Sequence, residues 1–102
     1  MEQYRLRIYK LLQMIPKGKV TTYGAIAQYL NISSPRIVGR ILHLNTHPEK
    51  FPCHRVVYSN GALSPGYAFG GYKAQKRKLA QEGIAFKHEK VLLQKHLVGF
   101  FD

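Results

Sequence analysis

Apolar residues in the first half of the chain recur at the spacing of a helix. One helical face is formed by Tyr4, Ile8, Leu11, Leu12 and Ile15. The segment Pro16–Lys19 should end this first helix. Thr22 can cap a second helix that runs from Tyr23 to about Leu30. Ser34 can cap a third, with Pro35 in its first turn, where a missing N–H costs nothing.

The third helix is expected to have a buried and an exposed side. The buried side consists of Ile37, Val38, Ile41, Leu42 and Leu44. The exposed side carries Arg36, Arg40 and His43. Two short helices joined by a tight turn predict a helix-turn-helix over about residues 22–44. Ordinary helical hairpins share this pattern, but the basic start of the third helix favours the version that contacts DNA.

The pattern changes after the third helix. Residues from about 45 to 71 form a loop region in which Arg55–Tyr58 is a candidate strand. Three further elements are expected: a basic helix from about Tyr72 to Gln81, a strand from Ile84 to Val91, and an apolar tail from Leu92 to Phe101 packed on the core. The prediction is a mostly α fold with short strands, a winged helix-turn-helix-like single domain that takes up residues 1–102.

Charge narrows the choice of partner. There are 16 Lys and Arg against 5 Asp and Glu, a net charge of +11. Such an excess favours a polyanion, and nucleic acid is the first candidate, because basic side chains neutralise phosphates and release counterions. A solvated basic surface would look the same. The sequence shows neither a membrane-spanning apolar run nor a signal peptide, so we expect a cytoplasmic protein with no membrane partner.

The single cysteine, Cys53, stands in the most informative stretch of the chain. One cysteine excludes an intramolecular disulfide, and a lone cysteine is most often a small buried apolar residue. A thiol reacts as its thiolate, which needs a base or a cationic neighbour, and His54 and Arg55 follow directly. A zinc site would need a second cysteine or a paired ligand motif beside His43 and His47, so we expect no metal and no cofactor.

Four segments in the same order carry a family resemblance. The stretch Pro52-Cys53-His54-Arg55-Val56-Val57 resembles the active-site signature of the O6-alkylguanine-DNA alkyltransferases, the methylated-DNA–protein-cysteine methyltransferases. The segments 15–24 and 34–39 resemble the family's entry to the helix-turn-helix and the start of its recognition helix. Gln81-Glu82-Gly83 resembles its late Glu-Gly element. The likeness covers about residues 4–86, the DNA-binding and active-site domain.

The resemblance implies a role for each matched position. Cys53 would be the nucleophile, and His54 would take its proton through a water. Glu82 would orient His54, and Asn45 would buttress the turn. The remaining roles concern DNA and substrate: Tyr23 would drive nucleotide rotation and protonate the leaving guanine, Arg36 would fill the place of the extruded base, Tyr67 would cover the pocket, and Arg40, Val57 and Ser59 would contact DNA or substrate.

The implied function is direct reversal of damage in double-stranded DNA that contains O6-alkylguanine. Each molecule would act once, since nothing in the chain suggests a way to cleave the thioether. We expect a monomer and leave cooperative binding along DNA open. We expect no counterpart of the additional N-terminal domain of larger family members, and Ser64-Pro65 and Phe69 lengthen the loop around Tyr67.

Two other functions stay open. Alkyltransferase-like proteins resemble the same domain but flag damage without repairing it, and they typically carry Trp where this chain has Cys53. A helix-turn-helix transcription regulator would explain the charge and residues 22–44, but it leaves residues 52–57 unexplained. A papain-like hydrolase is disfavoured, because 102 residues leave little room for a peptide cleft.

Overall fold

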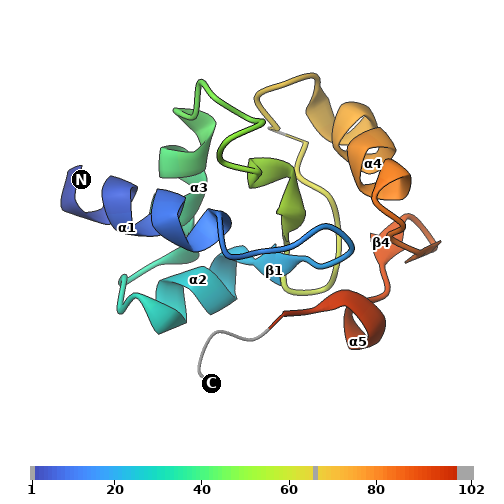
Figure 1. Cartoon of the computed structure of the whole chain (residues 1–102). Helices are drawn as coiled ribbons and strands as arrows, with labels where there is room; N and C mark the ends of the chain where they lie inside the picture. Colours follow the sequence, from blue (N-terminus) through green and yellow to red (C-terminus); the bar gives the residue numbers. More distant parts are fainter. Residues whose placement is uncertain (1, 66, 99–102) are drawn as a thin grey trace.

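The first half of the chain is mostly helical, and the second half combines helices with short strands (Figure 1). The computed structural model describes residues 2–65 and 67–98. The elements are α1 (Glu2–Leu12), β1 (Thr21–Thr22), α2 (Tyr23–Tyr29), α3 (Pro35–His43), the 3-10 turn η1 (Cys53–Arg55), β2 (Val56–Val57), α4 (Gly71–Gln81), β3 (Phe86–Lys87), β4 (Lys90–Val91) and α5 (Leu93–His96). The fold is therefore mostly α with short strands, as predicted.

Helices α2 and α3 form the predicted helix-turn-helix and pack with α1 around one apolar core. The Thr22 side chain accepts a hydrogen bond from the Ala25 amide at 3.0 Å, and Ser34 accepts one from the Arg36 amide at 3.1 Å. These caps satisfy amides that a helix start leaves without partners. The centre of this core is formed by Ile8, Leu12, Ile15, Ile26, Val38 and Ile41, each 1% exposed or less.

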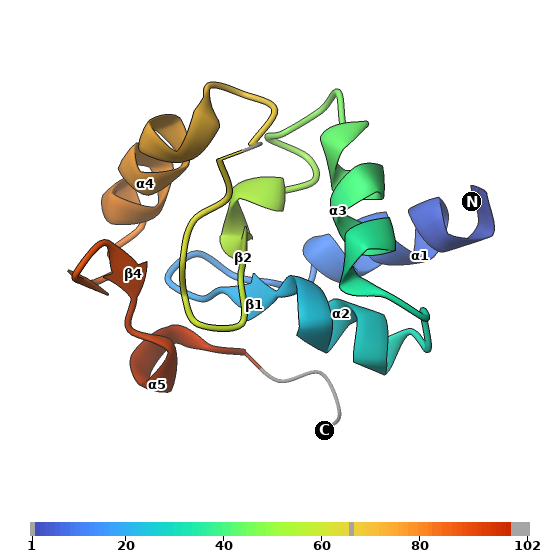
Figure 2. The same ribbon diagram turned by 180° about the vertical axis from the view of Figure 1, so that it is seen from behind.

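A short parallel strand pair joins the helix-turn-helix to the cysteine-containing turn. Thr21 pairs with Val56 and Thr22 with Val57. Figure 2 shows β1 and β2 side by side in the middle of the molecule, with α2 leaving from β1. Because Tyr23 begins α2 and η1 directly precedes β2, this pairing places the start of α2 beside Cys53.

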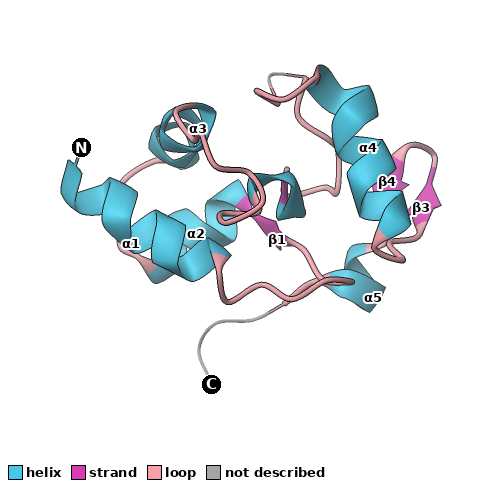
Figure 3. Ribbon diagram, turned by 45° about the horizontal axis from the view of Figure 1, so that its top comes forward, coloured by secondary structure: helices cyan, strands magenta, loops and turns pink. Residues whose placement is uncertain are grey.

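The second half packs α4 beside the β3–β4 hairpin (Figure 3). Its own core contains Val20, Val57, Leu63, Leu79, Ile84 and Val91. Gly61 ties the loop after β2 to β4: it accepts a hydrogen bond from the Val91 amide at 2.9 Å, and at its φ of +88° an added Cβ would lie 2.6 Å from the Val91 oxygen. Only glycine fits this close approach.

The C-terminal segment is held against the loop after α1. Buried His96 contacts the Gly18 carbonyl oxygen through Nδ1 at 3.0 Å and accepts from the Ala85 amide through Nε2 at 3.0 Å. Since Nε2 accepts, the proton lies on Nδ1, which donates to Gly18. Val20 hydrogen-bonds the backbone on both sides of Leu97. The predicted packing of the tail holds to Val98, and residues 99–101 lie outside the described part.

Three element predictions need correction. The strand expected over Ile84–Val91 is a hairpin of two short strands, because His88 and Glu89 adopt φ of +52° and +64° and reverse the chain. The strand expected over Arg55–Tyr58 covers only its middle two residues, since Arg55 belongs to the 3-10 turn. Leu44 caps α3 and is 51% exposed rather than buried.

The first helix is also shorter than its apolar face. It ends at Leu12, and Ile15 continues the buried face from a turn rather than from the helix. Among the described residues, none of the helices has the length and apolar character needed to cross a membrane.

Candidate functional site

A cavity of about 430 Å³ lies between the helix-turn-helix and the loop after β2. Tyr23 enters it from α2, Arg36 and Arg40 from α3, Cys53 from η1, and Tyr67 from the loop before α4. Its remaining lining residues are Pro35, Gly39, Leu42, His43, Tyr58, Ser64 and Ala68. The space is of the size that small-molecule pockets have, ~300–1,000 Å³. The only thiol of the chain therefore lies at a cavity able to take a small organic group.

Asn45 fixes the position of the thiol. Its Nδ2 donates to Cys53 Sγ at 3.3 Å and to the Phe51 carbonyl oxygen at 2.8 Å, and its Oδ1 accepts from the His47 amide at 2.9 Å. The Cys53 amide in turn donates to Phe51 at 2.7 Å. One buried side chain thus binds the sulfur and both ends of the loop that presents it.

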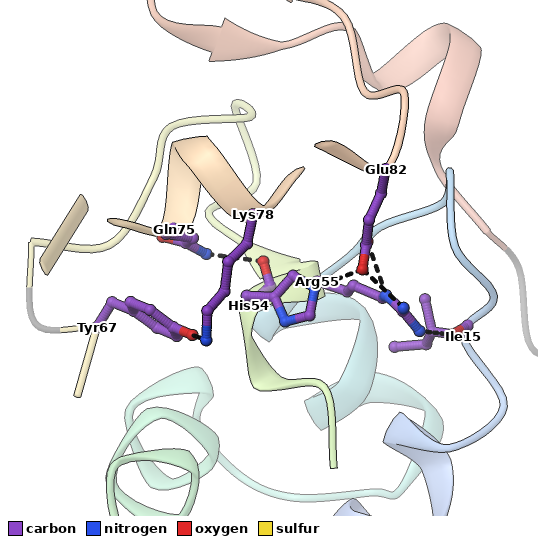
Figure 4. Close-up of polar contacts among 7 residues, drawn as sticks. All are labelled: Ile15, His54, Arg55, Tyr67, Gln75, Lys78 and Glu82. Atoms are coloured by element: carbon purple, nitrogen blue, oxygen red, sulfur yellow. Dashed lines mark hydrogen bonds and ion pairs between the residues drawn. The ribbon is translucent and has the colours of Figure 1, made fainter. Parts of the chain in front are cut away.

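Glu82 gathers His54 and Arg55 at the end of α4 (Figure 4). Its Oε2 accepts from His54 Nε2 at 2.9 Å and from Arg55 Nη2 at 2.8 Å, and its Oε1 accepts from Arg55 Nε at 2.9 Å. Arg55 Nη1 also donates to the Ile15 carbonyl oxygen at 2.6 Å. Because Nε2 donates to the carboxylate, a neutral His54 has its lone pair on Nδ1. That atom is buried and has no hydrogen-bond partner among the described residues.

Gln75 holds the same turn from the middle of α4. It is 0% exposed, although it stands in a strongly basic helix. Its Nε2 donates to the carbonyl oxygens of His54 and Val56, both at 3.0 Å, and its Oε1 accepts from the Ser64 amide at 2.9 Å. One side chain therefore fixes the backbone on both sides of Arg55.

Burial keeps the Cys53 thiol, the His54 imidazole and the Tyr23 phenol uncharged in the protein without DNA. Burial raises the pKa of the Cys53 thiol, although the Asn45 hydrogen bond and the charge of Lys78 act in the opposite direction. Burial also lowers the pKa of His54, so the imidazole is neutral and can accept a proton. Burial raises the pKa of Tyr23, which keeps its phenol protonated and able to donate.

Glu82 differs from these groups. Hydrogen bonds from Arg55 and His54 outweigh the opposing effect of burial and lower the pKa of its carboxyl. The carboxylate is therefore charged at neutral pH, and it is held in an ion pair of side chains that are each 12% exposed. Its charge favours the form of His54 that has gained a proton.

The residues singled out from the sequence fall into three groups. Tyr23, Arg36, Arg40, Cys53 and Tyr67 all line the cavity. Asn45, His54 and Glu82 lie behind it, and the last two line a separate depression together with Arg55. Two do not reach the cavity: the Val57 side chain is 0% exposed within β2, and Ser59 stands on an exposed turn. The contact predicted for backbone groups near Val57, and that predicted for Ser59 with DNA or substrate, remain predictions.

Sequence reasoning missed three residues at the site. Tyr58 lines the cavity, is 43% exposed, and tilts against Tyr23 with 5.4 Å between ring centroids. Gln75 and Lys78 face the site from α4, and Lys78 contacts Tyr67. An exposed aromatic residue just after the signature hexapeptide could have pointed to Tyr58. Nothing in the basic pattern of α4 distinguishes the two inward-facing residues from their neighbours.

No three metal-binding side chains (His, Cys, Asp or Glu) gather into a candidate metal site within residues 2–65 and 67–98.

Comparison with known proteins gives the family. Residues 3–84 match the family described as 6-O-methylguanine DNA methyltransferase, DNA binding domain. The chain is 40% identical over 87 residues to alkyltransferase-like protein 1 of Schizosaccharomyces pombe, covering 82% of this chain and 79% of that one. It is 48% identical over 69 residues to a methylated-DNA–protein-cysteine methyltransferase of Pyrobaculum aerophilum, covering 68% and 45%.

The fold comparison agrees with the sequence comparison. The crystal structure of S. pombe Atl1 in complex with damaged DNA containing O6-carboxymethylguanine superposes with a TM-score of 0.86 at 30% identity, and 98% of each chain is covered. The chain spans about a third to a half of the length of relatives that carry methyltransferase names. These matches and the shared fold show that the chain belongs to the 6-O-methylguanine DNA methyltransferase family and corresponds to its DNA-binding domain.

Proposed function

We propose that this protein binds double-stranded DNA containing O6-alkylguanine and transfers the alkyl group to Cys53. The observation that carries the proposal is the position of Cys53 Sγ, which lies at a cavity of about 430 Å³ and is hydrogen-bonded by Asn45. The His54–Glu82 pair stands directly behind this turn. Family membership supports the reaction class, since relatives are named as methylated-DNA–protein-cysteine methyltransferases.

A guanine inside a duplex cannot present its O6 substituent to a thiol that is 5% exposed, so the nucleotide must leave the stack. The net charge of +11 supplies phosphate contacts that hold DNA of any sequence. Arg36 is exposed at the start of α3 and borders the cavity, where its planar guanidinium can replace the extruded base in the stack. Unstacking costs a few kcal/mol, which these contacts offset.

The transfer step is an in-line displacement. Sγ forms a bond to the alkyl carbon while the bond from that carbon to guanine O6 breaks. The thiol proton moves to Nδ1 of His54 through one water, and Glu82 stabilises the imidazolium that results. Tyr23 donates a proton to the guanine as the alkyl bond breaks, so that an unmodified neutral guanine is restored within the DNA strand. Proton return from His54 to Tyr23 through solvent completes the balance, and the thioether product leaves Cys53 spent.

The raised pKa of Cys53 accounts for the need for this proton path. A buried thiol above its usual pKa holds almost no standing thiolate at neutral pH. Removal of the proton must therefore accompany binding of the substrate. The neutral His54, oriented by a charged carboxylate, is the group placed to accept it.

Intact mass spectrometry tests the proposal. The protein is incubated with duplex DNA containing one O6-methylguanine and with a matched undamaged duplex. One added methyl group, located on Cys53 by peptide mapping and absent from Cys53→Ala, is the expected result. Tight lesion binding without any adduct would refute the transfer and leave damage sensing as the function.

Damage sensing is the second candidate, and one observation favours it. The structure of S. pombe Atl1 superposes on 98% of this chain with a TM-score of 0.86, whereas a methyltransferase structure from Pyrococcus kodakaraensis superposes on 79% of this chain with a TM-score of 0.70. The presence of a thiol at Cys53 favours transfer instead. A transcription regulator would bind an undamaged operator as tightly as lesion DNA. Action as a monomer in the cytoplasm remains part of the proposal.

A further inference from the structure

One face of α4 points three side chains at the active-site region. Gln75, Lys78 and Glu82 stand at i, i+3 and i+7, which places them on the same side of a helix. Gln75 and Glu82 hold the turn that contains His54, as described above. Lys78 lies between them and reaches toward Tyr67 at the cavity (Figure 4).

The ammonium of Lys78 lies among neutral groups. Its Nζ donates to the Tyr67 hydroxyl at 2.7 Å and lies 5.3 Å from the centroid of the Tyr67 ring and 5.5 Å from that of Phe69. Among the residues that the structure describes, no carboxylate forms an ion pair with it. Its neighbour Lys76, in contrast, is paired with Glu89. Lys78 is thus a partly buried cation whose direct partners are the hydroxyl of Tyr67 and the ring of Phe69.

We propose that Lys78 is a positioning residue for the chemistry of Cys53. Its ammonium provides the positive potential that stabilises negative charge on Sγ, and its hydrogen bond holds Tyr67 as a wall of the cavity. For alkyl transfer to DNA this role rests on the function proposed above. The effect of Lys78 on the reactivity of the thiol toward other alkylating agents does not depend on that function, because it follows from the position of Lys78 in the fold.

The direction of the effect follows from the charge. A cation favours the thiolate over the thiol, and the charge of Lys78 lowers the pKa of both Cys53 and His54. It therefore opposes the burial that keeps the thiol protonated, and it also helps to keep the imidazole uncharged. Burial raises the pKa of Tyr67, so its phenol stays neutral and does not cancel the positive charge of the ammonium.

Other ionisable groups lie near the same thiol, and their effects on it must be distinguished from that of Lys78. Those at the cavity or in the turn are Tyr23, Arg36, Arg40, His43, His54, Tyr58 and Tyr67, while Arg55 and Glu82 stand behind the turn. Arg36 and Arg40 are exposed on α3, where DNA phosphates would neutralise them. Lys78 lies on α4 and contacts Tyr67, a lining residue of the cavity, from behind.

The pH dependence of thiol alkylation tests this role without DNA. Iodoacetamide forms a bond from Sγ to its CH2 carbon and releases iodide, while the thiol proton goes to solvent. Because Cys53 is the only cysteine, the mass gain that is absent from Cys53→Ala under the same conditions reports on this site alone. The rate is measured from pH 6 to 10 for the natural protein, Lys78→Met, Lys78→Arg and the matched control Lys76→Met, which removes an equal charge from the same helix.

We expect Lys78→Met to raise the midpoint of the rate profile by about 0.5–1 pH unit and to slow alkylation at neutral pH about three- to tenfold, since a nearby charge shifts a pKa by that order. Lys78→Arg keeps the charge and should stay near the natural profile, and Lys76→Met should leave it unchanged. Equal profiles for Lys78→Met and Lys76→Met would overturn the proposal, as would a shift in Lys78→Arg as large as in Lys78→Met.

Far-UV circular dichroism of each variant shows whether it folds. If Lys78→Met does not fold, Lys78→Gln replaces it, since that change also removes the charge and keeps a hydrogen-bond donor for Tyr67. Methyl transfer from an O6-methylguanine duplex is then measured under single-turnover conditions. The proposal predicts that Lys78→Met slows it by a similar factor. If the iodoacetamide profile shifts but the natural protein transfers no methyl group, the role of Lys78 holds and the proposed function fails.

Discussion

Replacement of Glu82 by alanine should be among the most damaging single changes outside the apolar core. The Glu82 carboxylate accepts three hydrogen bonds, one from His54 and two from Arg55. All three side chains are at most 12% exposed. Breaking a buried ion pair by removal of one partner costs about 3–5 kcal/mol, because the remaining charge is left without compensation. The bond from Arg55 to the Ile15 carbonyl oxygen offsets part of this loss.

We therefore expect Glu82→Ala to lower the free energy of unfolding by about 3 kcal/mol, a large share of the ~5–15 kcal/mol that a small domain has. Urea titration followed by far-UV circular dichroism measures it, with an unchanged m-value. Glu89→Ala is the matched control, since Glu89 pairs with Lys76 while 70% of its side chain is exposed. That change should cost at most ~1 kcal/mol. Similar losses for the two variants would refute the reasoning.

Three further predictions follow from the same contacts. Asn45→Ala should raise the pKa of Cys53, since it removes a hydrogen bond to the sulfur; the pH profile of iodoacetamide alkylation measures this, and an unchanged midpoint would count against it. Arg36→Ala should slow methyl transfer from duplex DNA more than transfer from the free base O6-benzylguanine; equal slowing in single-turnover assays would exclude a role in base replacement. Stability should fall as pH drops below about 6.5, first through His54 and then through Glu82, because folding depresses both pKa values and the unfolded chain binds protons first. Urea midpoints from pH 4 to 8 check this, and a flat profile in natural protein would contradict it.

The helices could be predicted because their causes are local. Apolar spacing marks the core face of α1, and the side chains of Thr22 and Ser34 make the capping bonds expected of them. The strands could not be predicted with the same success. Strands of two residues are too short to show alternation, and the β3–β4 hairpin depends on left-handed conformations at His88 and Glu89 that their residue types do not favour strongly.

The candidate site was predictable as far as the hexapeptide around Cys53 and the family resemblance reach. Gln75 and Lys78 could not be found, because their partners lie far away in the chain: Gln75 binds the His54 carbonyl oxygen, 21 residues earlier. In a helix rich in lysine both look like solvated residues, and only the packing of α4 against η1 turns them inward.

The stoichiometry of repair shows whether Cys53 takes up the alkyl group and does so once. A fixed amount of protein is titrated with an excess of duplex containing O6-methylguanine, and the restored guanine is quantified after DNA digestion. If Cys53 takes up the alkyl group, restored guanine rises to one equivalent per protein molecule and then stops, with methylated Cys53 in equal amount. Bound lesion DNA with no restored guanine would contradict it, and so would restoration that continues beyond one equivalent.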